Sequence, residues 1–315
     1  MTAYTEKIQE AAKRLLEEGK VDMVIGFRKG SVPMMNQPHY AKTAGDVQQF
    51  IWDSHCGLNL ANYLTDRKEK VAVVAKGCDS RNIANHIVEN KISREQVYVI
   101  GVPCTGMVDR HKIPQMVEGE IVAVEEDGDT IAVKTTSGSQ DFNKSEVLQQ
   151  NCANCSHRNP VIYDELIADL VEEQTDTDMF ESVREIEAMR PEEKWDYFDD
   201  LISTCIRCYA CRNACPLCYC PLCFVDESNP QWVGKGQDPM DVRTFHWLRA
   251  YHCAGRCTDC GACERVCPMG IKIREFTKKL NKDCYDLYGW EAGLNTDERP
   301  PLDTYRPNDP EEFIK

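Results

Sequence analysis

The sequence predicts two domains of different fold class, an N-terminal α/β domain with a mostly parallel sheet and a β-hairpin insert, and a C-terminal α+β domain organised around cysteines. Three observations predict this division. Apolar strands alternate with helices early in the chain, an Asp-Gly turn separates two apolar segments in its middle, and twelve of the 18 cysteines lie between Cys205 and Cys267. We expect the α/β domain at 1–160, an acidic helical connector at 161–200, the cysteine-rich domain at 201–285 and an irregular tail at 286–315.

The first hundred residues carry the pattern of a parallel α/β unit. Apolar residues at helical spacing alternate with short, continuous apolar runs. We expect helices at 4–19, around 83–88 and at 46–64, the last interrupted near His55–Gly57, and strands at 21–26, 71–75 and 97–101. This alternation indicates a parallel sheet, in which ligands bind at the carboxyl ends of the strands. Cys78 and Cys104 follow the second and third strands and therefore fall at that edge.

Residues 119–135 predict an antiparallel hairpin. Apolar segments lie on either side of Asp127-Gly128, and an Asp-Gly pair suits the positive φ angles of a tight hairpin turn. The later stretch 164–200 is acidic and mostly helical in pattern, and Pro191 suits the first turn of a helix that ends near Ser203. We therefore expect the hairpin to be an insert in the α/β domain and the helices to connect the two domains.

The charge and the apolar runs exclude several classes of partner. The net charge is −15, which argues against nucleic acid and anionic membranes as main partners. The apolar runs fall far short of the roughly 20 residues that a membrane-spanning helix needs. The N-terminus has no apolar signal core. These features predict a cytoplasmic protein without membrane insertion.

Two cysteine runs in the second domain have the spacing C-x2-C-x2-C-x3-C-P. This spacing is typical of bacterial ferredoxins with two 4Fe–4S clusters, in which the fourth cysteine of each run binds the other cluster. Zinc ribbons instead carry separated pairs of cysteines, and disulfide frameworks occur in short secreted chains. We therefore expect a ferredoxin-like domain with one cluster on Cys205, Cys208, Cys211 and Cys267, and another on Cys257, Cys260, Cys263 and Cys215.

The first domain has a possible third set of ligands. Cys78 and Cys104 lie at strand ends, and Cys152 and Cys155 form a later C-x2-C loop, so that the four could hold a third 4Fe–4S cluster. A zinc site and a catalytic thiol at Cys104 are the alternatives. We assign no catalytic residue.

Other residues leave alternatives open. Cys218, Cys220 and Cys223 lie between the two runs and either bind a fourth metal centre or are small buried residues. The second interpretation is favoured for Cys253. Cys56 either replaces one ligand of the first-domain set or is a core residue, which is favoured, and Cys284 has no assigned role. Arg28, Lys29 and Gly30 follow the first strand, and this basic loop either cradles the phosphate of a flavin such as FAD or is simply solvated.

Short motifs in the first domain resemble the beta subunit of coenzyme F420 hydrogenase and formate dehydrogenase. The motifs are Lys76–Arg81, Ile100–Gly106 and Cys152–Cys155. The resemblance implies a 4Fe–4S cluster beside a flavin. Residues 201–275 are similar to the two-cluster ferredoxin domains of anaerobic oxidoreductase and heterodisulfide-reductase-type complexes, and Cys208–Pro216 and Ala254–Cys263 carry this similarity.

We therefore expect an iron–sulfur electron-transfer subunit of a cytoplasmic anaerobic oxidoreductase complex. It would pass electrons between a catalytic subunit, of the hydrogenase, formate dehydrogenase or heterodisulfide-reductase type, and a soluble carrier. One alternative is a flavin-containing catalytic subunit that exchanges hydride with deazaflavin or NAD. Another is an interaction module stabilised by zinc.

Overall fold

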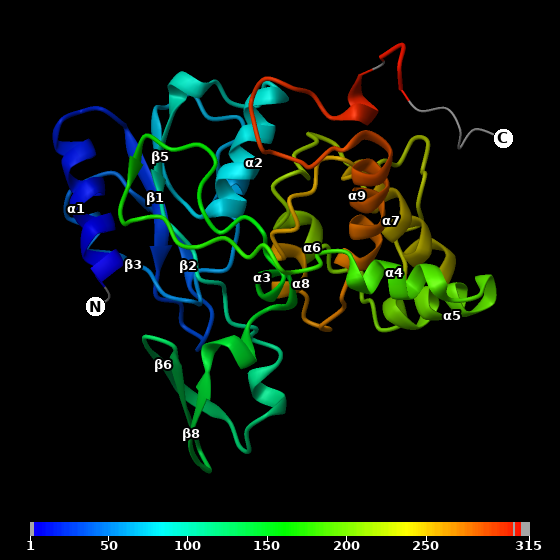
Figure 1. Cartoon of the computed structure of the whole chain (residues 1–315), viewed down its shortest axis with the longest axis horizontal. Coiled ribbons are helices and arrows are strands. Elements are labelled where there is room, and N and C mark those ends of the chain that lie inside the picture. The colour runs from blue at the N-terminus through cyan, green and yellow to red at the C-terminus, as the bar shows by residue number, and fades with distance from the viewer. Residues whose placement is uncertain (1–2, 305, 310–315) are drawn as a thin grey trace.

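The N-terminal part of the chain folds around a mostly parallel sheet. The computed structural model describes residues 3–304 and 306–309. The strands of this sheet are β1 (Met23–Arg28), β2 (Gln37–Ala41), β3 (Phe50–Ile51), β4 (Val71–Ala75), β5 (Val97–Gly101) and β9 (Glu165–Leu166). Their order is β2-β1-β4-β5-β9; β1, β4, β5 and β9 run parallel, and β2 and β3 pair antiparallel with β1. The predicted mostly parallel sheet is confirmed (Figure 1).

Helices lie on both sides of this sheet (Figure 1). α1 (Ala3–Glu17) buries Ile8 and Leu15, and α2 (Gly77–Val88) buries Ile83. All five residues of β4 are buried, as expected for a parallel strand that is covered on both faces. Because α2 begins directly after β4, its first turn lies at the carboxyl edge of the sheet.

The helical structure expected over residues 46–64, with an interruption near His55–Gly57, is wrong. The segment forms two short 3-10 helices, η1 (Asp46–Gln49) and η2 (Leu60–Tyr63), with β3 between them. Strand pairing overrides the helical spacing here, because Phe50 and Ile51 pair with β1. The remaining 3-10 helices are η3 (Arg94–Gln96), η4 (Ile113–Gln115), η5 (Lys144–Val147) and η6 (Pro301–Asp303).

A small antiparallel sheet lies beside the main one (Figure 1). It consists of β6 (Ile121–Asp127), β7 (Thr130–Thr135) and β8 (Gly138–Asn143), in that order. The predicted hairpin is confirmed, with Gly128 in its turn at a φ of 57°, and β8 adds a third strand. Glu126 of β6 ties this sheet to the main domain, since it accepts a hydrogen bond from the backbone N–H of Ser54 at 2.7 Å.

In the rest of the described chain, helices alternate with long irregular segments. These helices are α3 (Gln150–Ala153), α4 (Glu181–Ala188), α5 (Pro191–Ile202), α6 (Ala210–Asn213), α7 (Pro239–His252), α8 (Ala262–Arg265) and α9 (Arg274–Tyr288). Residues 201–285 are all described and contain helices and turns but no strand, which differs from the expected α+β fold. The two cysteine runs form turns and the short helices α6 and α8. No helix among the described residues is long and apolar enough to cross a membrane.

Candidate metal centres

The two cysteine runs form loops with the same backbone conformation. In the first loop, Arg207 and Tyr209 have φ angles of 49° and 59°. In the second loop, the equivalent Asp259 and Gly261 have φ angles of 55° and 71°. Positive φ is uncommon for residues other than glycine and costs free energy. Its recurrence at matching positions indicates that both loops are shaped for the same purpose.

This conformation turns backbone donors toward sulfur. The N–H of Arg207 donates to Sγ of Cys205, and the N–H of Asp259 donates to Sγ of Cys257, both at 3.4 Å. Such amide concavities stabilise anions, and hydrogen bonds to sulfur tune the potential of an iron–sulfur cluster. Both loops are therefore chemically suited to thiolate ligands.

The loops pack against each other through α6 and α8 (Figure 1). Cys267, at the end of the second run, lies beside Cys205: burial raises the pKa of Cys205, and Cys267 raises it further. Burial raises the pKa values of Cys257 and Cys260 to about 12, and Cys215 of the first run adds to both shifts. The structure thus brings the thiols together in the crossed arrangement that the spacing predicts. The ligand assignment itself stays a prediction.

A buried guanidinium lies among these thiols. Arg249 of α7 is 4% exposed; its Nη2 donates to the carbonyl oxygen of Cys211 at 3.2 Å, and its Nε has no hydrogen-bond partner. Burial disfavours its charge, but the nearby Cys215 and Cys263 hold the pKa of Arg249 well above its usual range. An uncompensated buried cation is costly. The surroundings therefore fit an anionic group, and an iron–sulfur cluster with four thiolates is one.

His246 also faces a predicted ligand. Its Nε2 lies 3.2 Å from Sγ of Cys205, and burial, with a smaller effect of Arg249, lowers the pKa of His246 to about 3. The ring is therefore neutral near pH 7 and can donate one N–H to sulfur. Sequence reasoning missed both residues. The sequence feature that could have found them is helical spacing, because Val242, Phe245 and Arg249 recur at helical intervals on the buried face of α7.

The four predicted ligands of the first domain line one cavity. Cys78 lies in the first turn of α2, Cys104 follows β5, Cys152 lies on α3, and Cys155 comes shortly after it. Burial is the main cause that raises the pKa of Cys104 to about 11 and that of Cys155 to about 12. The free thiols of Cys104 and Cys155 are thus neutral near pH 7. A metal would have to displace their protons.

Two features support anionic sulfur in this cavity. The backbone N–H of Gly106, at a φ of 106°, donates to Sγ of Cys104 at 3.4 Å. Lys76 is buried and pairs with Asp79 at 2.7 Å. Although burial opposes its charge, Asp79 and the neighbouring Cys78 raise the pKa of Lys76 above its usual range. A positive charge therefore stands beside the first-domain thiols.

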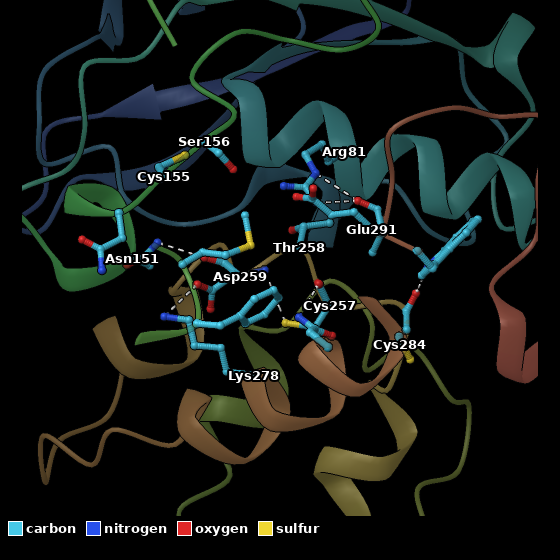
Figure 2. Close-up of a pocket in the computed structure, with 17 residues that line it drawn as sticks. Arg81, Asn151, Cys155, Ser156, Cys257, Thr258, Asp259, Lys278, Cys284 and Glu291 are labelled. Atoms are coloured by element: carbon cyan, nitrogen blue, oxygen red, sulfur yellow. Dashed lines mark hydrogen bonds and ion pairs between the residues drawn. The ribbon is translucent and has the colours of Figure 1, made fainter. Parts of the chain in front are cut away.

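The first-domain cavity adjoins the second cysteine run. Cys260 lines it together with the four first-domain thiols. Polar contacts fix this junction, since Asn82 of α2 donates to Oγ1 of Thr258 at 2.7 Å and Asn151 of α3 donates to the carbonyl oxygen of Asp259 at 3.0 Å. Figure 2 shows a neighbouring pocket, lined by Cys155 from the first domain and Cys257 from the second. Predicted ligands of two clusters thus lie close together.

The insert between the runs brings three thiols close together. The sulfurs of Cys215, Cys218 and Cys253 all lie within 4.8 Å of one another. Cys220 and Cys223 line a large cavity with Cys218. Other cysteines lie elsewhere: Cys56 is buried in the core of the α/β domain, as the sequence favoured, and Cys284 is buried on α9.

The predicted phosphate loop borders an open cavity. Lys29 and Gly30 line a cavity of about 780 Å³ together with residues of β6. Arg28 instead directs Nη1 toward Oε1 of Gln49, at 3.4 Å. A second cavity, of about 160 Å³, shares Trp52 and Asp53 with the first and is also lined by Cys104. A flexible basic side chain, a glycine and a large cavity beside a predicted cluster ligand are compatible with a flavin.

Comparisons with known proteins show what the chain is similar to. Residues 201–271 match the family model of the 4Fe-4S dicluster domain. The chain is 24% identical to the F420-dependent formate dehydrogenase subunit beta of Methanocaldococcus jannaschii over 352 aligned positions, which cover 92% of each protein. It is therefore similar to this beta subunit along nearly its whole length. The F420-dependent formate dehydrogenase 1 subunit beta of Methanococcus maripaludis is 25% identical, over 92% of this chain and 90% of that protein.

These relatives confirm the resemblance that the sequence predicted. A solved structure, the F420-reducing NiFe hydrogenase complex from Methanosarcina barkeri, contains a chain that is 18% identical, with a TM-score of 0.38. The match covers 49% of this chain and 62% of that one.

Proposed function

We propose that this chain is an iron–sulfur electron-transfer subunit of a cytoplasmic, anaerobic oxidoreductase complex. The continuous series of thiol sets carries this proposal. Cys260 lines the cavity of the first-domain thiols, and the two cysteine runs pack through α6 and α8. A bound 4Fe–4S cluster would supply a redox centre with a potential set by hydrogen bonds to sulfur and by burial. The chain holds the thiols close together and directs backbone N–H groups at several of them, among them Cys104, Cys205 and Cys257.

The proposed ligands form three sets of four thiolates. Two sets belong to the dicluster domain and exchange their last cysteines, and the third lies at the carboxyl edge of the α/β sheet. The sets are Cys205, Cys208, Cys211 and Cys267; Cys257, Cys260, Cys263 and Cys215; and Cys78, Cys104, Cys152 and Cys155.

The partner is proposed from the relatives. The printed names of two similar proteins describe beta subunits of F420-dependent formate dehydrogenases. They support a catalytic partner subunit of the formate dehydrogenase type, with hydrogenase and heterodisulfide-reductase types as related candidates. They also support coenzyme F420 as the soluble carrier.

One observation favours a second candidate, a flavin-containing catalytic subunit that exchanges hydride with deazaflavin. The cavity lined by Lys29 and Gly30 adjoins the cavity that Cys104 lines. FAD bound there would lie beside a ligand of the first-domain cluster. Flavin analysis of the anaerobically purified protein decides this, and diaphorase activity should accompany the flavin.

Iron analysis and EPR test the electron-transfer proposal. Fully loaded protein should contain about twelve irons per chain, four for each cubane. Cys260→Ser should remove the EPR signal of one dicluster centre, and Cys104→Ser should remove only the first-domain signal. Cys284→Ser, which changes a buried cysteine outside the three sets, is the matched control. Fewer than about eight irons in wild-type protein, or unchanged EPR in both ligand variants, would contradict the proposal.

A further inference from the structure

A long segment of the dicluster domain has no regular secondary structure to hold it. Between the end of α6 at Asn213 and the start of α7 at Pro239, residues 214–238 contain no helix or strand. Only a few of its apolar side chains are buried, among them Leu217, Val225 and Val233. Loops of this length are uncommon in compact domains unless they are functional or otherwise fixed. This segment also carries Cys218, Cys220 and Cys223, which the three proposed clusters leave over.

Cys218 lies close to Cys253, another cysteine outside the three proposed clusters. Its sulfur and that of Cys253, at the end of α7, lie within 4.8 Å of each other and of Cys215. Four sulfurs around one zinc ion, each at about 2.3 Å, are roughly 3.8 Å apart. Small side-chain movements would therefore bring Cys218 and Cys253 to that separation.

Cys218 and Cys253 belong to none of the three proposed clusters, although Cys215, the third member of their close group, belongs to one. Among the described residues, no other group of three or more potential metal ligands lies as close together. Thiolates of a cubane each bind a different iron and are spread more widely, whereas thiolates of a mononuclear site share one ion. The tight group therefore favours a single metal ion.

Cys220 and Cys223 can complete the coordination. Both line the cavity of about 790 Å³ that Cys218 also lines. Cys220 is exposed and Cys223 is partly exposed, so these two thiols lie on the open side, while Cys253 is buried. Arg212 and Asp226, which form an ion pair at 2.8 Å, also line the cavity.

We propose that Cys218, Cys220, Cys223 and Cys253 bind one zinc ion, which fastens the segment 214–238 to the end of α7. The inference goes beyond the proposed function and rests on it only in leaving Cys215 to the dicluster domain. Zinc has no redox chemistry in such a site and would act by crosslinking.

Metal analysis of the intact chain tests the proposal. Anaerobically purified protein, supplied with zinc during expression, should contain about one zinc per chain in addition to its iron. X-ray absorption at the zinc edge should show four sulfur ligands at about 2.3 Å. Cys218→Ser and Cys253→Ser should each lose most of the zinc and keep the dicluster EPR signals, and Cys284→Ser should keep both. Cys215→Ser, in contrast, should lose a dicluster signal.

The outcomes separate this site from the proposed electron transfer. Protein with full iron and no zinc, or with about sixteen irons and an additional cluster signal, would overturn the zinc site and leave the electron-transfer function intact. If Cys218→Ser does not fold, wild-type protein still decides: a zinc chelator should accelerate proteolysis within 214–238 without bleaching the clusters. Unchanged proteolysis after complete zinc removal would contradict the crosslink.

Discussion

Replacing Asp79 with asparagine removes the charge partner of a lysine buried at the first-domain thiols. Lys76 and Asp79 have side chains that are 2% and 0% exposed, and Nζ lies 2.7 Å from Oδ2. Asp79 also accepts hydrogen bonds from the backbone N–H groups of Lys76, at 3.2 Å, and of Leu60, at 3.1 Å. Asparagine keeps the shape and one acceptor oxygen. The main effect is therefore a buried ammonium without its counter-charge.

The expected loss follows from this burial. Breaking a buried ion pair by removing one partner costs about 3–5 kcal/mol. With a urea m-value of about 3 kcal/mol/M, the unfolding midpoint should fall by roughly 1–2 M. The assay is anaerobic urea unfolding, followed by tryptophan fluorescence and by cluster absorbance.

A matched control isolates the effect of burial. Asp286 pairs with Lys282 at 2.6 Å, but its side chain is 50% exposed. Asp286→Asn should therefore change the free energy of unfolding by no more than about 1 kcal/mol. If Asp79→Asn shifts the midpoint as little as this control does, the buried pair does not stabilise the fold as argued.

Three further predictions concern the hairpin sheet, the first-domain cavity and the dicluster domain. Although burial opposes ionisation of Glu126, hydrogen bonds from Lys144 and Ser54 hold its pKa below the usual 4.5. The stabilising effect of the ionised Glu126 is therefore present near neutral pH and is lost as the pH falls through the depressed pKa. Glu126→Gln should cost about 1–3 kcal/mol at pH 7 and lose less stability than wild type on acidification, and an identical pH profile for the two proteins would refute this. Gly106→Ala should destabilise the protein by about 1–3 kcal/mol and weaken the first-domain EPR signal, because φ is 106° and a Cβ would lie 2.8 Å from Leu148. Gly128→Ala, in an open turn, is the control. Equal effects of the two substitutions would argue against a special role for Gly106. Arg249→Met should lower the reduction potentials of both dicluster centres, where a tenfold change in a one-electron equilibrium corresponds to about 59 mV. Potentials that stay unchanged in an EPR redox titration would show that the guanidinium does not act on the clusters.

The sequence determined which residues could bind metal, because cysteine spacing acts locally. A C-x2-C-x2-C-x3-C-P run carries its chemistry within a few residues, and so Cys257 and Cys260 could be recognised without a fold. Continuous apolar runs such as Val71–Ala75 likewise predicted buried parallel strands. The region 46–64 was misread because its helical spacing competes with pairing to β1, which lies some twenty residues away in the chain.

Only the tertiary structure determined which distant residues lie close together in space. Nothing in the spacing placed Cys260 at the first-domain cavity, Arg249 among thiols of both runs, or Cys253 beside Cys218. These neighbours come from distant segments that meet only in the folded chain. Short sequence motifs thus determine the type of ligand, whereas long-range packing determines the charges and distances that govern electron transfer.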